Sequence, residues 1–333
     1  MEQNTEKVYK YKVCTRCITY NHAPYIEDAM NGFTMQETTF PVITLIIDDA
    51  STDGEPEVIR QYLSENFQEP YRTEETDDYN LICANHKTNE NCIFVVFLLK
   101  YNHYSIKKPK MPYLSEWLDN SKYHALCEGD DYWTCSQKLQ KQVDFLDRHP
   151  DFSLCFHNAI IDRKEQGKDN TVFAELQTRE YTPYEITVRW TTPTASVLMT
   201  TECQTLYTKL ARSKKIVYGD SFLRSCCISI GRIYGFAETM SVYRKHPGGM
   251  VFNSSFEQRK RFCNQINYEI SVFPEQKKAL TDSLSNVYFD LSVNSVSKKH
   301  YINAVKCFFQ SLFSSPAIFF KNIIKYIKNS HWI

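Results

Sequence analysis

The sequence lacks an excess of charge of either sign, since Lys plus Arg and Asp plus Glu both number 39. A basic surface for nucleic acid is therefore not predicted. Long hydrophobic runs are also missing: the stretch from Cys92 to Leu99 is far shorter than the roughly 20 residues that span a bilayer. The first twelve residues are polar and lack the apolar segment of a signal peptide. We expect a cytoplasmic protein whose membrane contact, if there is any, is peripheral.

The twelve cysteines lack the close, regular spacing of a disulfide scaffold. We interpret them as reduced thiols of a hydrophobic core, with zinc ligation as the second choice. Hydrophobic residues make up 42% of the chain and aromatic residues 14%, which indicates a folded globular protein.

Strand and helix patterns alternate along the first half of the chain. Apolar runs predict strands, and residues at helical spacing predict the helices between them. The predicted strands are 12–20, 41–47, 79–85, 122–128 and 152–161, and the predicted helices are 24–35, 55–67 and 137–148. Residues 90–122 are expected to hold a helix and loops. This alternation favours a mostly parallel sheet flanked by helices.

Polar clusters follow three of these strands. "TYNHAP" follows the first, "DDASTDG" the second, and "EGDD" comes about 80 residues later, at Glu128 to Asp131. Ligands of open α/β sheets bind beyond the carboxyl ends of the strands, so the three clusters are expected to meet at one edge. Neighbouring carboxylates repel one another, which makes a bound cation or hydrogen-bonding ligand the favoured explanation over solvated turns.

Several ordered motifs between residues 10 and 250 resemble those of the family 2 glycosyltransferases, which have the GT-A fold. They are "CITYNHAPYIEDAM", "LIIDDASTDG", "ALCEGDDYW" followed by "KLQKQVDFL", and "YGDSF". The resemblance implies an enzyme that transfers sugar from a nucleotide-sugar donor with inversion at the anomeric carbon. The "Asn-x-Gly" element of many relatives is absent from "CANHKTNENC", and so is the QxxRW motif of processive synthases. We therefore expect one sugar to be transferred per encounter.

The resemblance also implies a nucleotide site and a metal site. Thr19 and Tyr20 would flank the base, Asp49 would accept a hydrogen bond from it, and Asp130 would contact the ribose. Asp131 would bind Mg²⁺ or Mn²⁺, because adjacent residues of an extended chain point to opposite sides and hard cations prefer oxygen ligands.

Two further segments can be interpreted either as parts of the active site or as ordinary structural elements. Asp220 of "YGDSF" would be the base that activates the acceptor, or the cap of a helix that begins at Ser221, or both. Arg244 and His246 of "SVYRKHPGGM" would close over the donor diphosphate, with His246 as an added metal ligand, or would belong to an ordinary surface turn.

The expected fold is a GT-A domain over residues 1–250, with a mixed, mostly parallel sheet, followed by a C-terminal helical region over residues 251–333. The segment 317–329 places Lys321, Lys325 and Lys328 on one helical face, with Phe320, Ile323, Ile324 and Ile327 beside it. Such a helix could lie on the cytoplasmic face of the inner membrane or pack on the domain.

The function expected from these observations is a metal-dependent, inverting hexosyltransferase of surface polysaccharide biosynthesis. Its donor would be a UDP-sugar, and its acceptor a glycan or a lipid-linked glycan. Two rivals remain. A sugar-nucleotide nucleotidyltransferase would need a Gly-rich, basic loop after the first strand, which "TYNHAP" does not supply. A non-catalytic relative would bind a nucleotide or glycan without turnover.

Overall fold

A computed structural model describes residues 8–189, 191–211, 216–249 and 255–330 of the chain. It divides into two compact units. The sheet unit comprises Met1–Glu180, Thr191–Thr205 and Gly231–His246, and the helical unit comprises Tyr181–Trp190, Leu206–Ile230 and Pro247–Ile333. The domain boundary expected between residues 250 and 251 lies outside the described residues, as does Met250 of "SVYRKHPGGM", so this boundary stays a prediction.

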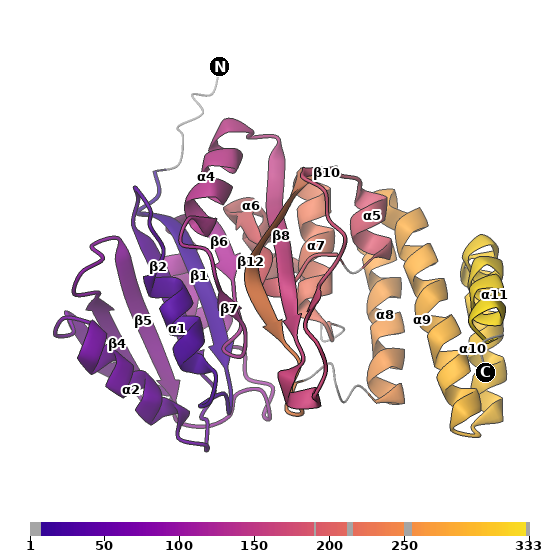
Figure 1. The fold of residues 1–333 in the computed structure, drawn as a ribbon, viewed down its shortest axis with the longest axis horizontal. Helices are drawn as coiled ribbons and strands as arrows, with labels where there is room; N and C mark the ends of the chain where they lie inside the picture. Colours follow the sequence, from indigo (N-terminus) through magenta and orange to yellow (C-terminus); the bar gives the residue numbers. More distant parts are fainter. Residues whose placement is uncertain (1–7, 190, 212–215, 250–254, 331–333) are drawn as a thin grey trace. The chain divides into compact units, whose positions relative to one another are not determined.

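The sheet unit is built on one mixed sheet, whose strands run in the order β10-β12-β8-β11-β6-β1-β2-β5-β4-β3. The central strands β6, β1, β2 and β5 are mutually parallel, and β8 and β12 form a second parallel pair (Figure 1). Strand β11 joins the two groups and is antiparallel to β6 and β8. The strands are β1 Tyr11–Thr19, β2 Val42–Asp48, β3 Arg72–Glu75, β4 Tyr79–Asn85, β5 Cys92–Leu99, β6 Ser121–Leu126, β7 Tyr132–Trp133, β8 Phe152–Asp162, β9 Thr171–Val172, β10 Arg179–Tyr181, β11 Leu198–Thr200 and β12 Arg232–Arg244.

Helices cover both faces of the central strands. On one face, α1 (Ile26–Thr34), α2 (Glu55–Asn66) and α4 (Lys138–Arg148) contribute residues such as Met30, Ile59 and Val143 to a core. On the other face, α3 (Met111–Leu118) contributes Leu114, Trp117 and Leu118 to a second core. Burial on both sides explains why β2 is buried at every position and apolar at all but Thr44 and Asp48, without the alternation of a half-exposed strand.

The structure confirms the predicted α/β fold and the predicted strands and helices to within a few residues. One element was wrong: residues 90–122 contain the buried strand β5 as well as α3. β5 pairs with β2 in parallel and with β4 in antiparallel, inside the sheet and not at its edge. A short, continuous apolar run has no periodicity that separates a buried strand from a helix, which is the physical reason for this error.

The cysteines are free thiols, and all but Cys135 are buried, as expected for core residues. Cys14 and Cys17 have the Cys-x-x-Cys spacing that can indicate a metal or redox pair. Their side chains enter different cores on the two faces of β1, because residues three apart on a strand point in opposite directions. This pair is therefore structural.

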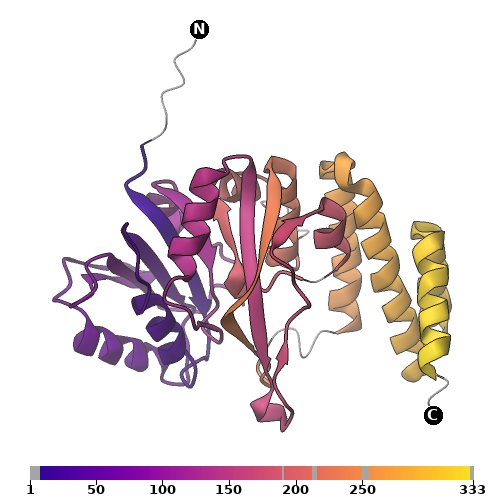
Figure 2. The same cartoon turned by 45° about the horizontal axis from the view of Figure 1, so that its top comes forward.

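The helical unit is formed by long helices that pack side by side (Figure 2). Its helices are α5 Pro183–Val188, α7 Gly219–Ile230, α8 Phe256–Val272, α9 Lys277–Ser297, α10 Tyr301–Ser314 and α11 Pro316–Ser330, while α6 Thr201–Leu210 runs across the boundary with the sheet unit. α9 contacts α5, α8, α10 and α11, and its Leu284 and Leu291 share a core with Cys263 and Cys307. No helix of the described residues is long and apolar enough to cross a membrane.

Candidate functional site

The parallel register brings the three predicted polar clusters to one edge of the sheet. Thr19, the last residue of β1, pairs with Asp48 of β2, and Arg16 pairs with Leu126 of β6. The amide of Gly129 donates to the carbonyl of Ile18, at 3.3 Å. The carboxyl ends of β1, β2 and β6 therefore meet, which confirms the convergence predicted from their sequence positions.

A buried hydrogen-bond network organises the end of β1. The Thr19 hydroxyl donates its proton to the Glu55 carboxylate, and its oxygen lies 3.1 Å from Nδ1 of His22. Glu55 also accepts hydrogen bonds from the His22 amide and the Ser51 hydroxyl, both at 2.8 Å. A hydroxyl has only one proton to donate, so Nδ1 of His22 must carry a proton to bond the Thr19 oxygen. In a neutral imidazole, this leaves the lone pair on Nε2.

Gly129 is required by the close approach of this network. A Cβ atom at Gly129 would lie 2.1 Å from Oγ1 of Thr19 and 3.2 Å from Nδ1 of His22. No side chain fits there without displacing Thr19. The glycine of "EGDD" therefore lets the chain after β6 pass against the end of β1.

His22, Asp130 and His246 form a group with the composition and spacing of a metal site. One potential ligand atom from each lies within 4.8 Å of the others. Asp130 Oδ2 is 2.9 Å from Nε2 of His246 and 3.8 Å from Nε2 of His22. Imidazole ligands suit transition metals, whereas Mg²⁺ prefers oxygen ligands, so of the two cations that the resemblance implies these residues fit Mn²⁺.

Electrostatics favour the ionised form of Asp130 and the neutral form of His22. Burial alone would raise the pKa of Asp130, but the hydrogen bond from His246 and the charges of His22 and His246 outweigh burial and lower that pKa. Burial lowers the pKa of His22, against the charge of Asp130, which acts to raise it. An ionised carboxylate and a neutral imidazole are the forms that bind metals.

Asp131 has different surroundings from its neighbour, as the alternation of an extended chain predicts. Its buried Oδ1 accepts a hydrogen bond of 2.9 Å from the Arg244 amide. Burial and the charge of Asp130 raise the pKa of Asp131 well above its usual range. Asp131 is not a member of the group formed by His22, Asp130 and His246.

The Arg244 side chain contacts several residues around Asp130, at the carboxyl edge of the parallel strands. Its guanidinium donates to the Asp130 carbonyl at 3.0 Å and to the Asp28 carboxylate. It also lies over the rings of Tyr132 and Tyr25, at 4.4 and 5.2 Å from their centroids. Arg244 thus fixes the segment after β6 against α1 and the end of β12.

Asp49 holds the loop that follows β5. It is buried and accepts hydrogen bonds from the amides of His103 and Tyr104, at 2.8 and 3.1 Å, and its carboxylate lies 2.8 Å from Nζ of Lys110. Its predicted contact with a nucleotide base stays a prediction. Tyr20, the other predicted base contact beside the buried Thr19, is 43% exposed.

Asp220 belongs to the helical unit. The expected cap of a helix from Ser221 was wrong in position: α7 begins at Gly219, so Asp220 lies inside its first turn, and its carboxylate is 3.3 Å from Nη1 of Arg224. Its role as a base stays a prediction.

His22 and Glu55 are the site residues that the sequence analysis did not single out. His22 stands in "TYNHAP", directly after the first strand, so its position was a usable signal. Glu55 reads as an ordinary first-turn acid of a helix, and its partnership with Thr19 depends on the pairing of β1 with β2.

Comparison of the sequence with known proteins finds mycobacterial relatives. No protein-family description matches the sequence. Uncharacterised proteins of Mycobacterium bovis and Mycobacterium tuberculosis are 31% identical over 245 residues, which are 74% of this chain and 62% of theirs, so the match spans about three fifths of their length.

Solved structures with similar folds include two in complex with nucleotide sugars. Staphylococcus aureus TarS residues 1–349 in complex with UDP-GlcNAc has a TM-score of 0.58 at 15% identity, covering 91% of this chain and 81% of TarS. The mannosyltransferase PcManGT of Pyrobaculum calidifontis, in complex with GDP-Man and Mn²⁺, has a TM-score of 0.51 at 12% identity, covering 97% and 81%. The chain therefore has a glycosyltransferase fold of the GT-A type.

Proposed function

We propose that this chain is a metal-dependent, inverting glycosyltransferase of family 2 that moves one sugar from a nucleotide-sugar donor to an acceptor. The observation that carries the proposal is the group of His22, Asp130 and His246 at the carboxyl edge of the parallel strands. The fold is shared with proteins that bind UDP-GlcNAc and GDP-Man, which supports a nucleotide-sugar donor. We propose a UDP-sugar as the donor, a glycan or lipid-linked glycan as the acceptor, and surface polysaccharide biosynthesis on the cytoplasmic side as the setting.

We assign the divalent cation, Mn²⁺ in preference to Mg²⁺, to Asp130 and His246 together with His22. This revises the expectation that Asp131 is the carboxylate ligand and Asp130 the ribose contact, because Asp130 has the imidazole partners and Asp131 accepts the Arg244 amide. A cation bound here would offset the negative charge that develops on the leaving diphosphate. Arg244, whose five donors exceed those used for Asp28 and the Asp130 carbonyl, is our candidate for a further diphosphate contact.

We propose that Thr19, Tyr20 and Asp49 belong to the nucleotide site. The buried Thr19 and Asp49 hold the end of β1 and the loop after β5 in place, and Tyr20 is exposed enough to contact a base. We propose Asp220 as the base that takes the proton from the acceptor hydroxyl while that oxygen attacks the anomeric carbon. One displacement with one base inverts the configuration at that carbon.

A thermal-shift titration with UDP, with Mn²⁺, and with both tests this function. We expect the two ligands together to raise the midpoint of unfolding more than either alone, and EDTA to abolish the effect. Asp130→Asn should remove the metal dependence, because it removes the only carboxylate of the group. Asp144→Asn, on the surface of α4, is the matched control. Equal stabilisation by UDP in Mn²⁺ and in EDTA would contradict the proposal.

A further inference from the structure

Helix α10 carries apolar residues on two opposite sides. Ala304, Cys307 and Ser311 are buried on the side that packs on α9. Ile302, Val305, Phe309 and Phe313 recur at spacings of three and four residues on the other side, where Ile302 is 87% and Phe313 79% exposed. A helix that packs by one face only would carry polar residues on this outer side.

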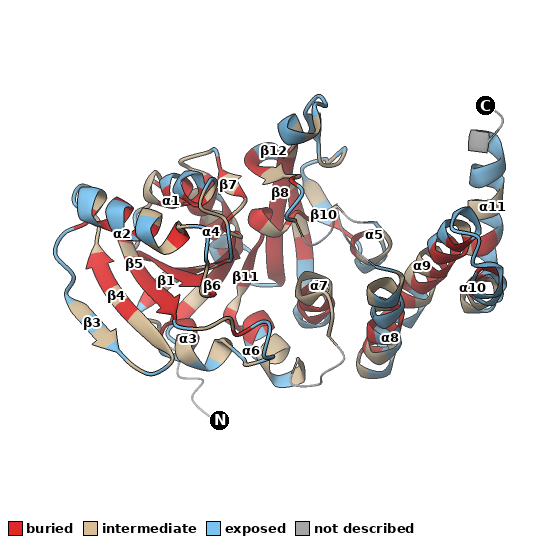
Figure 3. Ribbon diagram, turned by 90° about the horizontal axis from the view of Figure 1, so that it is seen from below, coloured by how far each residue is buried: buried red, intermediate tan, exposed pale blue. Residues whose placement is uncertain are grey.

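Helix α11 continues this pattern. Phe320, Ile324 and Ile327 recur at spacings of four and three residues and are each at least half exposed. Phe319 is buried instead, with its ring 4.7 Å from that of Phe308 in α10. Figure 3 shows α10 and α11 with long exposed stretches. Exposed apolar residues gathered in rows, and not scattered singly, indicate an interaction surface.

The same segment is strongly cationic. From residue 291 to the end of the sequence there are six lysines and no Asp or Glu. Lys306 lies beside the apolar row of α10, and Lys321, Lys325 and Lys328 form a row beside that of α11. The rest of the chain has a net negative charge, since the whole chain has a formal charge of zero.

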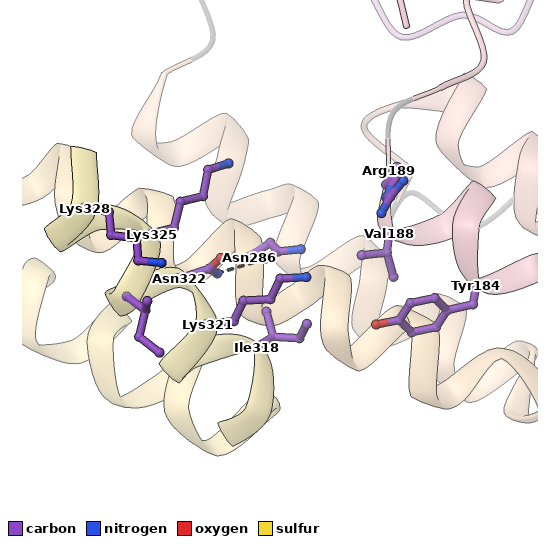
Figure 4. A pocket seen from close by; sticks show the side chains of 10 residues that line it. Tyr184, Val188, Arg189, Asn286, Ile318, Lys321, Asn322, Lys325 and Lys328 are labelled. Carbon is purple, nitrogen blue, oxygen red and sulfur yellow. Dashed lines mark hydrogen bonds between the residues drawn. The ribbon is translucent and has the colours of Figure 1, made fainter. Parts of the chain in front are cut away.

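A cavity of about 520 Å³ lies along the lysine row. Lys321, Lys325 and Lys328 line it together with Arg189, Tyr184 and Asn286 (Figure 4). No described Asp or Glu is among its lining residues. Four cations around a cavity without a carboxylate provide a place for phosphate oxygens.

We propose that α10 and α11 form a docking surface for an anionic lipid membrane. The apolar rows would enter the region between headgroups and acyl chains, while the lysine row and Arg189 contact lipid phosphates. Charge complementarity favours this occupant over a second copy of the chain, because two such surfaces facing each other would oppose their lysine rows. The proposal does not depend on the glycosyl transfer proposed above, and binding can be measured without turnover.

Sedimentation with lipid vesicles tests the surface. The full chain should sediment with vesicles of equal parts phosphatidylcholine and phosphatidylglycerol, less so in high salt, and hardly with phosphatidylcholine alone. The triple variant Lys321→Gln, Lys325→Gln, Lys328→Gln should bind roughly 100-fold more weakly, at about fivefold per lysine. The double variant Phe309→Ser, Phe313→Ser should lose about tenfold or more, because it removes two inserting rings.

Matched controls separate a specific surface from general charge. The triple variant Lys209→Gln, Lys260→Gln, Lys277→Gln removes the same charge from exposed positions of α6, α8 and α9, and should bind vesicles like the unchanged chain. Free inorganic phosphate should compete poorly if the membrane is the ligand. Equal losses in both lysine triples would overturn the proposal. So would a failure to bind anionic vesicles, or a dimer in solution that Phe309→Ser, Phe313→Ser dissociates without any vesicle binding.

Discussion

Lys138 is a buried lysine whose cost to the fold can be predicted and measured. Its side chain is fully buried, with Nζ 4.0 Å from the centroid of the Trp133 ring and 2.8 Å from Oε1 of Gln142. Burial lowers the pKa of Lys138 from its ordinary value of 10.5 to about 7. A shift of this size corresponds to roughly 5 kcal/mol for keeping the ammonium charged in the folded state.

The sign of the pH dependence follows from this lowered pKa. Between about pH 7 and pH 10.5 the unfolded chain holds a proton on Lys138 that the folded chain has released, so stability rises with pH over this window. The substitution Lys138→Met removes the titrating group. The advantage of the Met variant over the unchanged protein should therefore shrink by about 2–3 kcal/mol between pH 6.5 and pH 9.

Urea denaturation followed by circular dichroism at these two pH values measures the difference. Loss of the hydrogen bond to Gln142 leaves a buried acceptor unpaired, but that cost does not change with pH. Lys141→Met, on the same helix, is the matched control, because the Lys141 side chain is 43% exposed and its pair with Glu238 lies at the surface. The same Met advantage at both pH values would refute a lysine that loses its proton near pH 7.

Three further predictions concern the candidate site. Gly129→Ala should destabilise the fold by about 1–3 kcal/mol, measured by urea denaturation, since its Cβ would lie 2.1 Å from Oγ1 of Thr19; an unchanged midpoint would show that Thr19 moves freely. His22→Ala should weaken Mn²⁺ binding in calorimetry by about tenfold or more, whereas the exposed His149→Ala should not; equal affinities would remove His22 from the metal site. Asp220→Asn should keep donor binding and lose about 100-fold or more in transfer rate, and unchanged transfer would exclude Asp220 as the base.

The sequence predicted the part of the fold that rests on local patterns. The strands that end at Thr19, Asp48 and Leu126 were recognisable from β-branched and apolar residues, and their order was enough to place three polar clusters at one edge. Strand β5 was missed because a strand buried on both faces lacks alternation.

The site residues were predictable where polar side chains directly follow a strand. They were less predictable where the site depends on contacts between segments far apart in the sequence. His246 was predicted as a metal ligand and Asp130 only as a ribose contact, because their 2.9 Å contact and the inclusion of His22 arise from the meeting of three segments. Glu55 was not recognised because a first-turn carboxylate is ordinarily explained by its own helix. Its burial against Thr19 exists only once β1 and β2 are paired.

The separation of the three candidate ligands along the chain has a consequence for unfolding. Asp130 and His246 are 116 positions apart, and His22 lies more than a hundred positions before Asp130. A cation bound by all three would close two large loops of polypeptide. It would reduce the conformational entropy of the denatured chain, much as a pair of crosslinks would. Loading with metal should then slow amide exchange at the ends of β1, β6 and β12 together, so that one ion couples the stability of strands formed by the beginning, middle and end of the sheet unit.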